Sequence, residues 1–149
     1  MLLHAHQSAF CLNLIDYDGP RNGRTHGQRN RLLTNLQLME NGHRWEAFGA
    51  LFYTDELQKW LGWLTDLLTD RPPSRQVVFR EPHVRIHLDD GPPVGETVRL
   101  RFMLCYGAAP PWWTGEPDVP YPFALECSRS VIKQAVVDLT LQLRAFPIR

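Results

Sequence analysis

Histidines offer this chain its most obvious metal-binding chemistry, and their spacing limits what they could hold. His4 and His6 would lie on one side of a strand, a spacing seen among metal ligands, but no matching cluster of histidines and carboxylates follows them. The alternative is an ordinary N-terminal segment. His83 and His87 are four positions apart on a predicted strand, so at about 3.3 Å per residue they would lie about 13 Å apart. Such a pair cannot bind one ion, and we expect no metal site.

Nucleophilic side chains are present, but none stands in a recognisable catalytic motif. Cys11, Cys105 and Cys127 are widely spaced and odd in number, which argues against a disulfide framework and is typical of a reducing compartment. Cys105 and Cys127 fall in apolar strand contexts, where thiols usually serve as packing groups. No serine has the G-x-S-x-G surroundings of a hydrolase, and no glycine-rich phosphate loop occurs. We therefore expect a protein without enzymatic activity and without a cofactor.

Size and charge narrow the class of protein further. The 149 residues fit one domain, 1–149, and a hydrophobic content of 44% is enough for a sizeable core. Sixteen basic residues balance sixteen acidic ones, so the composition predicts neither a nucleic-acid nor a membrane partner. No apolar run approaches the roughly 18–20 residues of a membrane span, and no signal-peptide pattern opens the sequence. We expect a cytoplasmic location, and the sequence leaves the oligomeric state open.

Two amphipathic helices are the clearest elements in the hydrophobic pattern. The first follows Thr54 as its N-cap, carries acidic residues in its first turn and ends at Arg71, before two prolines. The second follows Ser128 or Ser130 and ends at Pro147. Their apolar stripes are Leu57, Trp60, Leu61, Leu64, Leu67 and Leu68 in the first helix, and Ile132, Ala135, Val136, Leu139, Leu143 and Phe146 in the second.

Alternating apolar residues predict about five to six strands around these helices. Asn41-Gly42 is a strong signal for a two-residue hairpin turn, and Pro82 is expected to bend one continuous strand. The predicted strands are 10–17, 32–40, 43–53, 77–89, 97–106 and 123–127. The order β-β-β-α-β-β-β-α predicts an α+β fold, with two amphipathic helices packed on a mainly antiparallel sheet. Residues 1–30 could form a peripheral N-terminal extension.

Charge is unevenly distributed along the chain although its total is zero. Segment 21–44 holds five arginines against one glutamate, whereas segment 55–70 holds four carboxylates against one lysine. Asp55, Asp66 and Asp70 lie opposite the leucine stripe of the first helix, which would show an acidic face to solvent. One interpretation is that this face is simply solvated. The other is that it binds a basic partner.

Segment 107–122 is long, contains five prolines and carries Trp112-Trp113. Its length predicts either a functional loop or a poorly ordered one. Glu116 and Asp118 follow the two tryptophans there. Because tryptophan is enriched in interface hot spots, one interpretation is that this loop binds a protein. The alternative is a loop that folds its own tryptophans onto the sheet. The candidate partner-binding residues are Asp55, Asp66, Asp70, Trp112, Trp113, Glu116 and Asp118.

The order of several segments resembles a known family. The segments are HRWEAFGALFYTDELQKWLGWLTDLL, VVFREPHVRIHLDD, VRLRFMLCY, and FALECS before SVIKQAVVDLTLQLRAFPIR. They resemble the WapI-type immunity proteins, which bacteria encode beside polymorphic toxins. The positions that carry the match are Trp45, Phe48, Glu56, Leu57, Trp60, Pro82, Phe146 and Pro147. The match covers about residues 31–149, and the first 30 residues and the Trp112-Trp113 loop look like additions.

This resemblance implies a cytoplasmic, non-enzymatic protein that binds a cognate toxin domain, often a nuclease, and blocks it. A protein that binds a small apolar ligand is the alternative from another class. Strands followed by one long C-terminal helix also suit a helix-grip fold, in which the helix closes a sheet around an apolar cavity. The apolar face of strand 97–106 could line that cavity. A hairpin before the first helix argues against this fold, and a solid core would favour the immunity interpretation.

Overall fold

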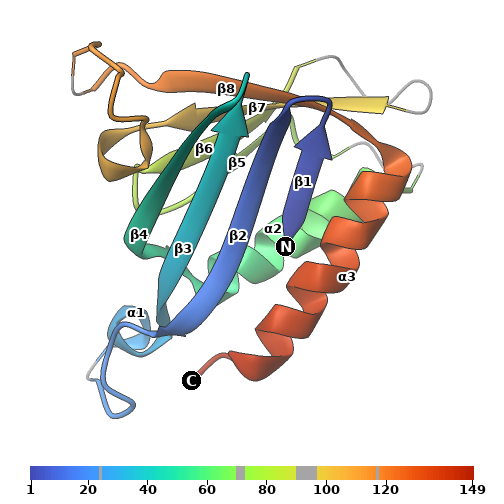
Figure 1. Cartoon of the computed structure of the whole chain (residues 1–149). Helices are drawn as coiled ribbons and strands as arrows, with labels where there is room; N and C mark the ends of the chain where they lie inside the picture. Colours follow the sequence, from blue (N-terminus) through green and yellow to red (C-terminus); the bar gives the residue numbers. More distant parts are fainter. Residues whose placement is uncertain (24, 70–72, 90–96, 117) are drawn as a thin grey trace.

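Two four-stranded antiparallel sheets form the frame of the protein (Figure 1). The computed structural model describes residues 1–23, 25–69, 73–89, 97–116 and 118–149. The first sheet has the order β1-β2-β3-β4 and the second the order β5-β6-β7-β8. The strands of the first sheet are β1 (Leu2–Ala5), β2 (Ser8–Tyr17), β3 (Arg31–Glu40) and β4 (His43–Tyr53). Those of the second are β5 (Gln76–Val78), β6 (Val84–Leu88), β7 (Thr97–Leu104) and β8 (Tyr121–Ser128).

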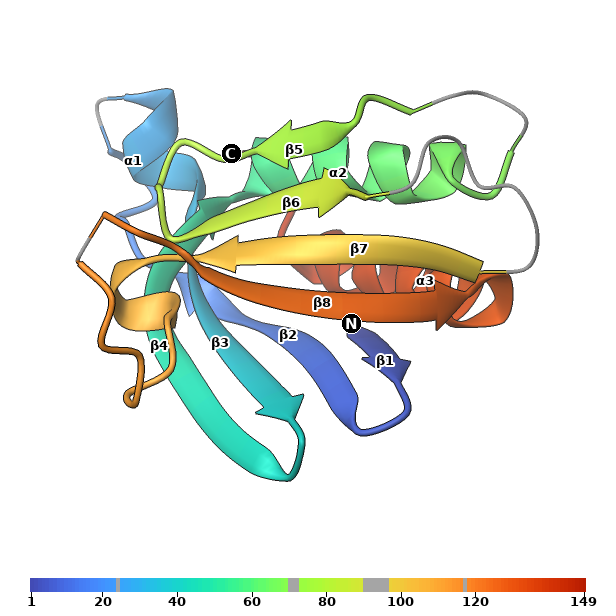
Figure 2. The same ribbon diagram turned by 90° about the horizontal axis from the view of Figure 1, so that it is seen from above.

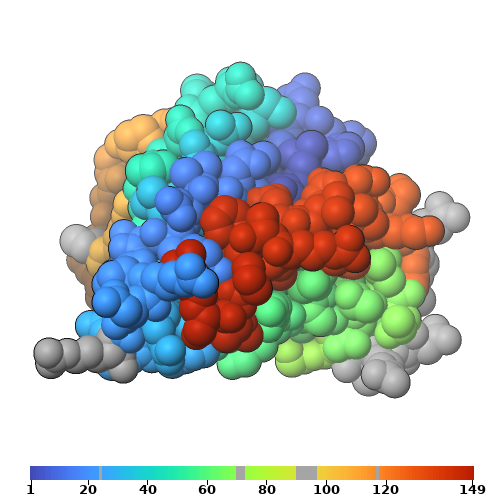
Figure 3. Space-filling model, turned by 90° about the horizontal axis from the view of Figure 1, so that it is seen from below, coloured from blue at the N-terminus to red at the C-terminus, as the bar shows by residue number. Residues whose placement is uncertain are grey.

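Two long helices run side by side against these sheets. They are α2 (Thr54–Asp66) and α3 (Arg129–Ala145), and Figure 3 shows them next to each other on one face of the molecule. A short helix α1 (His26–Asn30) and a 3-10 turn η1 (Tyr106–Ala108) lie in connections. The predicted α+β fold is confirmed, with eight strands and three α-helices in the described residues rather than five to six and two. Among the described residues, no helix has the length and apolarity needed to cross a membrane.

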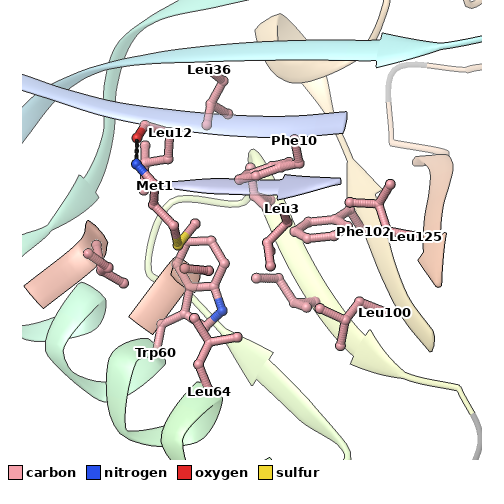
Figure 4. Close-up of a cluster of buried hydrophobic side chains, with 14 of the residues drawn as sticks. Met1, Leu3, Phe10, Leu12, Leu36, Trp60, Leu64, Leu100, Phe102 and Leu125 are labelled. Atoms are coloured by element: carbon pink, nitrogen blue, oxygen red, sulfur yellow. Dashed lines mark hydrogen bonds between the residues drawn. The ribbon is translucent and has the colours of Figure 1, made fainter. Parts of the chain in front are cut away.

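An aromatic core joins the two sheets (Figure 4). The Phe10 ring of β2 stacks on Phe102 of β7 with 4.4 Å between ring centroids, and Trp60 of α2 meets Phe10 edge-on at 6.0 Å. Phe102 is fully buried by such contacts, so the part of β7 that the small-ligand alternative needs as a cavity wall is used for packing. On the same strand face, Val98, Leu100 and Leu104 are buried, while Tyr106, just beyond the strand, is exposed.

The first seventeen residues belong to this core, so the predicted peripheral extension is wrong for them. β1 pairs antiparallel with β2, with Leu2 opposite Cys11 and Ala5 opposite Ser8. Their inward side chains are Met1, Leu3, Phe10 and Leu12, each at most 4% exposed. Burial of four large apolar side chains makes these strands a part of the fold.

A helix side chain caps the edge of β2 where the shorter β1 no longer covers it. Gln142 of α3 donates from Nε2 to the Leu12 carbonyl oxygen (3.1 Å) and accepts at Oε1 from the Leu14 N–H (2.8 Å). The amide thus takes the hydrogen-bonding position of a neighbouring strand. This contact fixes α3 to the first sheet.

Segment 77–89 forms two strands and not the one bent strand that was expected. β5 pairs antiparallel with β6, and Gln76 lies opposite His87. Pro82 lies in the connection between them, where its missing N–H costs no ladder hydrogen bond. Phe79 of the same connection is buried, with its ring centroid 5.9 Å from that of Trp60. The connection therefore carries its own anchor in the core.

The N-cap of α2 is Tyr53 rather than Thr54, which is the first helical residue. Glu56 reaches back to accept the Tyr53 N–H at Oε2 (3.1 Å), as in a capping box. The Thr54 hydroxyl donates instead to the carbonyl oxygen of Asn30 (3.4 Å). Thr54 therefore connects the start of α2 to the end of α1.

Candidate partner-binding surface

The connection from β7 to β8, residues 106–120, packs on the edge strand β4, and we call it the aromatic loop. Trp45 of β4 donates from Nε1 to the carbonyl oxygen of Ala108 (3.2 Å). The loop opens with Tyr106 in the left-handed region, at a φ of 51°, which reverses the chain directly after β7. Figure 2 shows the loop at the end of the second sheet, beside β4. It is therefore attached to both sheets.

Trp112 is the tryptophan that this loop presents to solvent. It remains 43% exposed although its ring centroid lies 5.2 Å from Trp45 and 5.3 Å from His43. These rings support the indole, and part of its surface remains exposed to solvent. A partly exposed, internally supported aromatic ring loses little conformational entropy when a partner covers it.

Trp113 is less exposed than Trp112 and joins the loop to the start of β8. Its Nε1 donates to the Val119 carbonyl oxygen (3.1 Å), and its ring lies 5.4 Å from that of Tyr121. Gly115 lies so close that a Cβ there would come within 2.4 Å of the indole. Of the two predicted tryptophans, only Trp112 thus offers a large exposed surface.

The acidic residues of the loop are on its outside. Glu116 and Asp118 are exposed, and neither forms an ion pair within the described part of the chain. Behind them, the Tyr121 hydroxyl donates to the Glu40 carboxylate. Burial, together with this bond, raises the pKa of Tyr121 to about 12, so the phenol stays protonated and keeps donating.

Asp55, predicted as part of an acidic docking face, is held by an arginine instead. Arg80 binds its carboxylate with both terminal nitrogens, at 2.6 and 3.1 Å, and Lys59 approaches at 4.0 Å. Burial opposes ionisation of Asp55, but the hydrogen bonds and charge of Arg80 outweigh it and lower the pKa. Asp55 therefore serves the internal structure of the α2 start.

The other predicted helix carboxylates do not extend the loop surface. Arg129, just after β8, donates to the Leu68 carbonyl oxygen at the far end of α2 (2.8 Å). The aromatic loop enters β8 at the opposite end, at Tyr121, and eight strand residues span about 23 Å. Asp66, the last residue of α2, is thus well separated from the loop, and Asp70 lies outside the described residues.

Glu56 is a buried carboxylate at the start of α2 whose contact with Arg80 was not predicted from the sequence. Its side chain is only 6% exposed and accepts two backbone N–H groups, from Tyr53 and from Arg80 (2.5 Å). Burial raises its pKa, and the two N–H donors oppose that shift. The Tyr53-to-Glu56 spacing fits a capping box, but no sequence pattern indicates the contact with Arg80, 24 residues away.

Groups with catalytic or metal-binding potential are dispersed in the structure. Within the described ranges, no three residues of His, Cys, Asp and Glu type gather closely enough to hold a metal ion. Burial raises the pKa of the Cys105 thiol, and that of Cys127 to about 12, so both stay protonated near neutral pH. The feature that the described surface does offer is an exposed, supported aromatic loop with an acidic rim.

The α+β fold with an exposed aromatic loop is the structural context for a comparison with known families. The model of the immunity protein WapI-like family matches residues 1–147, and the chain belongs to that family. The match starts at residue 1, so the first 30 residues are not additions to the family pattern. No curated protein matches the sequence.

Proposed function

We propose that this protein neutralises a cognate toxin domain by binding it, without catalysis and without a cofactor, in the cytoplasm. Membership of the WapI-like family supports an immunity role. A nuclease is the kind of toxin that the family resemblance favours. The partner is thus a protein rather than a nucleic acid or a membrane.

The exposed side of Trp112 is the observation that carries this proposal to a particular surface. Tryptophan in a supported, partly desolvated position is the type of residue that dominates interface energetics. Glu116 and Asp118 add negative charge next to it, and unpaired surface charge speeds encounter with a basic partner. We therefore assign Trp112 as the anchor, with Glu116 and Asp118 as its steering charges.

Binding kinetics with the toxin domain encoded beside this gene test the proposal. Trp112→Ala is expected to weaken affinity by about 30-fold, chiefly through faster dissociation, which corresponds to about 2 kcal/mol. The matched control is Phe48→Ala, because Phe48 is an aromatic residue of β4 that is 63% exposed and lies outside the loop. We expect Phe48→Ala to bind like the wild type.

Charge variants in the same assay test whether the acidic residues of the aromatic loop or those of α2 contribute to toxin binding. Reversing Glu116 and Asp118 to Lys is expected to slow association and weaken its salt dependence, whereas Asp66→Lys leaves both unchanged. Circular dichroism checks that every variant is folded. A wild-type protein that does not bind the toxin would refute the proposed function. Normal binding by Trp112→Ala would place the interface elsewhere.

A further inference from the structure

The outer face of the second sheet carries a row of arginines. Side chains alternate along β6 and β7, so Arg85 and His87 on β6 and Arg99 and Arg101 on β7 point away from the core. The strand register brings His87 opposite Arg101 and Arg85 opposite Met103. Figure 2 views the sheet from this side, and no helix or strand lies over it. We call this surface the arginine face.

Negative charge on the arginine face is insufficient to neutralise it. Asp89 binds two guanidinium groups at once, Arg101 at 2.8 Å and Arg99 at 3.5 Å. Arg85 forms no ion pair with any described residue. Asp89 itself is 13% exposed, whereas Arg99 and Arg101 are 53% and 47% exposed. Glu126 of β8 is a second outward carboxylate, exposed and opposite Arg99, so the strands of this face carry three arginines against two carboxylates. Asp89 also holds the side chains of Arg99 and Arg101 in place. These side chains therefore lose less conformational entropy when a partner binds.

A hollow opens at the centre of this face. It has a volume of about 300 Å³ and is lined by Arg75, His87, Leu88, Asp89, Arg101 and Met103. Asp89 in this lining already binds Arg101, so an acidic side chain of a partner is expected at Arg85, which has no ion pair within the described residues, and not in the hollow itself. Arginine suits a carboxylate because its planar fork can donate two parallel hydrogen bonds.

The arginine face is continuous with the aromatic loop. Tyr106 opens that loop, is 53% exposed and packs edge-on against His83 at 5.9 Å. His83 directly precedes β6, and its carbonyl oxygen accepts the Cys105 N–H (2.9 Å). His83 and Arg85 are two positions apart, so the alternation of the strand places both side chains on the outward side. A partner that covers the exposed Tyr106 of the loop would therefore also lie next to Arg85.

The composition of the face favours an acidic protein over a nucleic acid. Sheets that bind single-stranded nucleic acid stack the bases on aromatic rings. The remaining outward positions of the described strands are Gln76, Val78, Thr97, Met103, Pro122, Ala124, Glu126 and Ser128. None of these side chains is aromatic. A protein surface with carboxylates needs no such platform.

We infer that the arginine face binds an acidic patch of the same toxin domain, with Arg85 as the arginine that meets a carboxylate of the partner. This inference rests on the proposed function. It adds a second contact of opposite charge to the acidic rim of the aromatic loop. The toxin surface would then need a basic and an acidic region in a fixed order, which makes recognition selective.

Charge reversal on the arginine face tests the inference. Arg85→Glu and Arg101→Glu are each expected to weaken toxin affinity by about tenfold or more at physiological salt. Arg85→Glu is the cleaner variant, because it breaks no ion pair within the described structure. Lys133→Glu is the matched control, since Lys133 is an exposed cation of α3, and it should change affinity less than about twofold. Reversing the contacted toxin carboxylate to Arg should restore binding by Arg85→Glu.

The outcomes separate this inference from the proposed function. Wild-type binding that both arginine variants retain would overturn the arginine face and leave the immunity function standing. Failure of the wild type to bind the toxin would overturn both. A third measurement is the binding of a fluorescein-labelled dT20 oligonucleotide to the protein. Salt-sensitive binding of this probe, lost in Arg85→Glu, would show a nucleic-acid surface and overturn the acidic-protein partner.

Discussion

α2 and the aromatic loop contain the same kinds of residue, aromatic and acidic, and use them in opposite ways. The tryptophans of α2, Trp60 and Trp63, are at most 6% exposed, whereas Trp112 of the loop is 43% exposed. In the first turn of α2 the carboxylates bind Arg80 and backbone N–H groups, whereas those of the loop face solvent without ion pairs in the described residues. A charged or aromatic residue is available to a partner only where the fold leaves it uncommitted. Changes in α2 should therefore affect stability, and changes in the loop should affect binding.

The largest expected effect is on the packing face of α2. Leu64 is fully buried, so Leu64→Ala should lower the free energy of unfolding by about 2–5 kcal/mol through lost burial and the cavity left behind. Trp112→Ala in the loop should cost distinctly less, because much of its ring is already in water. Denaturant melts measure both. A loss below about half a kilocalorie per mole for Leu64→Ala would mean that α2 is not docked by this face.

An intermediate effect is expected at Glu56, where an acid of α2 has a purely internal role. Glu56→Ala leaves two backbone N–H groups without their acceptor and should cost about 2–3 kcal/mol. Glu56→Gln keeps one acceptor oxygen and should lose less. Melts of the two variants check the order, and toxin affinity of the folded protein should not change. Equal stability of wild type and Glu56→Ala would contradict the assigned capping role.

The smallest effect is a pH dependence from Asp55. Because Arg80 lowers the pKa of Asp55 below its ordinary value of 3.8, its stabilisation is complete above that pH and is lost as the pH falls through the folded-state pKa. Asp55→Asn removes it, at a cost of about 0.2–1 kcal/mol near neutral pH. The difference in unfolding free energy between wild type and variant should therefore shrink below pH 3.8. Glu116→Gln serves as the loop control, and a difference that grows on acidification would exclude the proposed ion pair.

Much of the fold could be predicted because local signals and final structure agree. The stripe of α2 and the Ser128 cap of α3, which accepts the Val131 N–H, arise from residues within a few positions of one another. Asn41 and Gly42 both adopt positive φ values, as the tight turn between β3 and β4 requires. Such features depend on short-range chemistry, which a single sequence displays.

The remainder depends on contacts between distant segments or on weak local signals. The turn between β1 and β2 places His6 at a positive φ without a glycine, so no standard hairpin signal marks these strands. The bond from Arg80 to Asp55 spans 25 positions, so an acidic helix face looked free in the sequence. Trp112 and Trp113 are neighbours of the same type, and only their burial in the folded loop distinguishes the exposed Trp112 from the half-buried Trp113.

The aromatic loop has a further consequence, because it also shields the edge of β4 through Trp45 and Ala108. An uncovered edge strand is a template for aggregation, so this contact gives the loop a structural role besides the proposed binding role of its exposed side chains. During coevolution with a changing toxin, substitutions at Glu116 or Asp118 could alter specificity without uncovering the strand. Loss of the hydrogen bond between Trp45 and Ala108 would instead expose that edge. We therefore expect evolutionary variation within immunity proteins of this architecture to concentrate on the outward side of the loop.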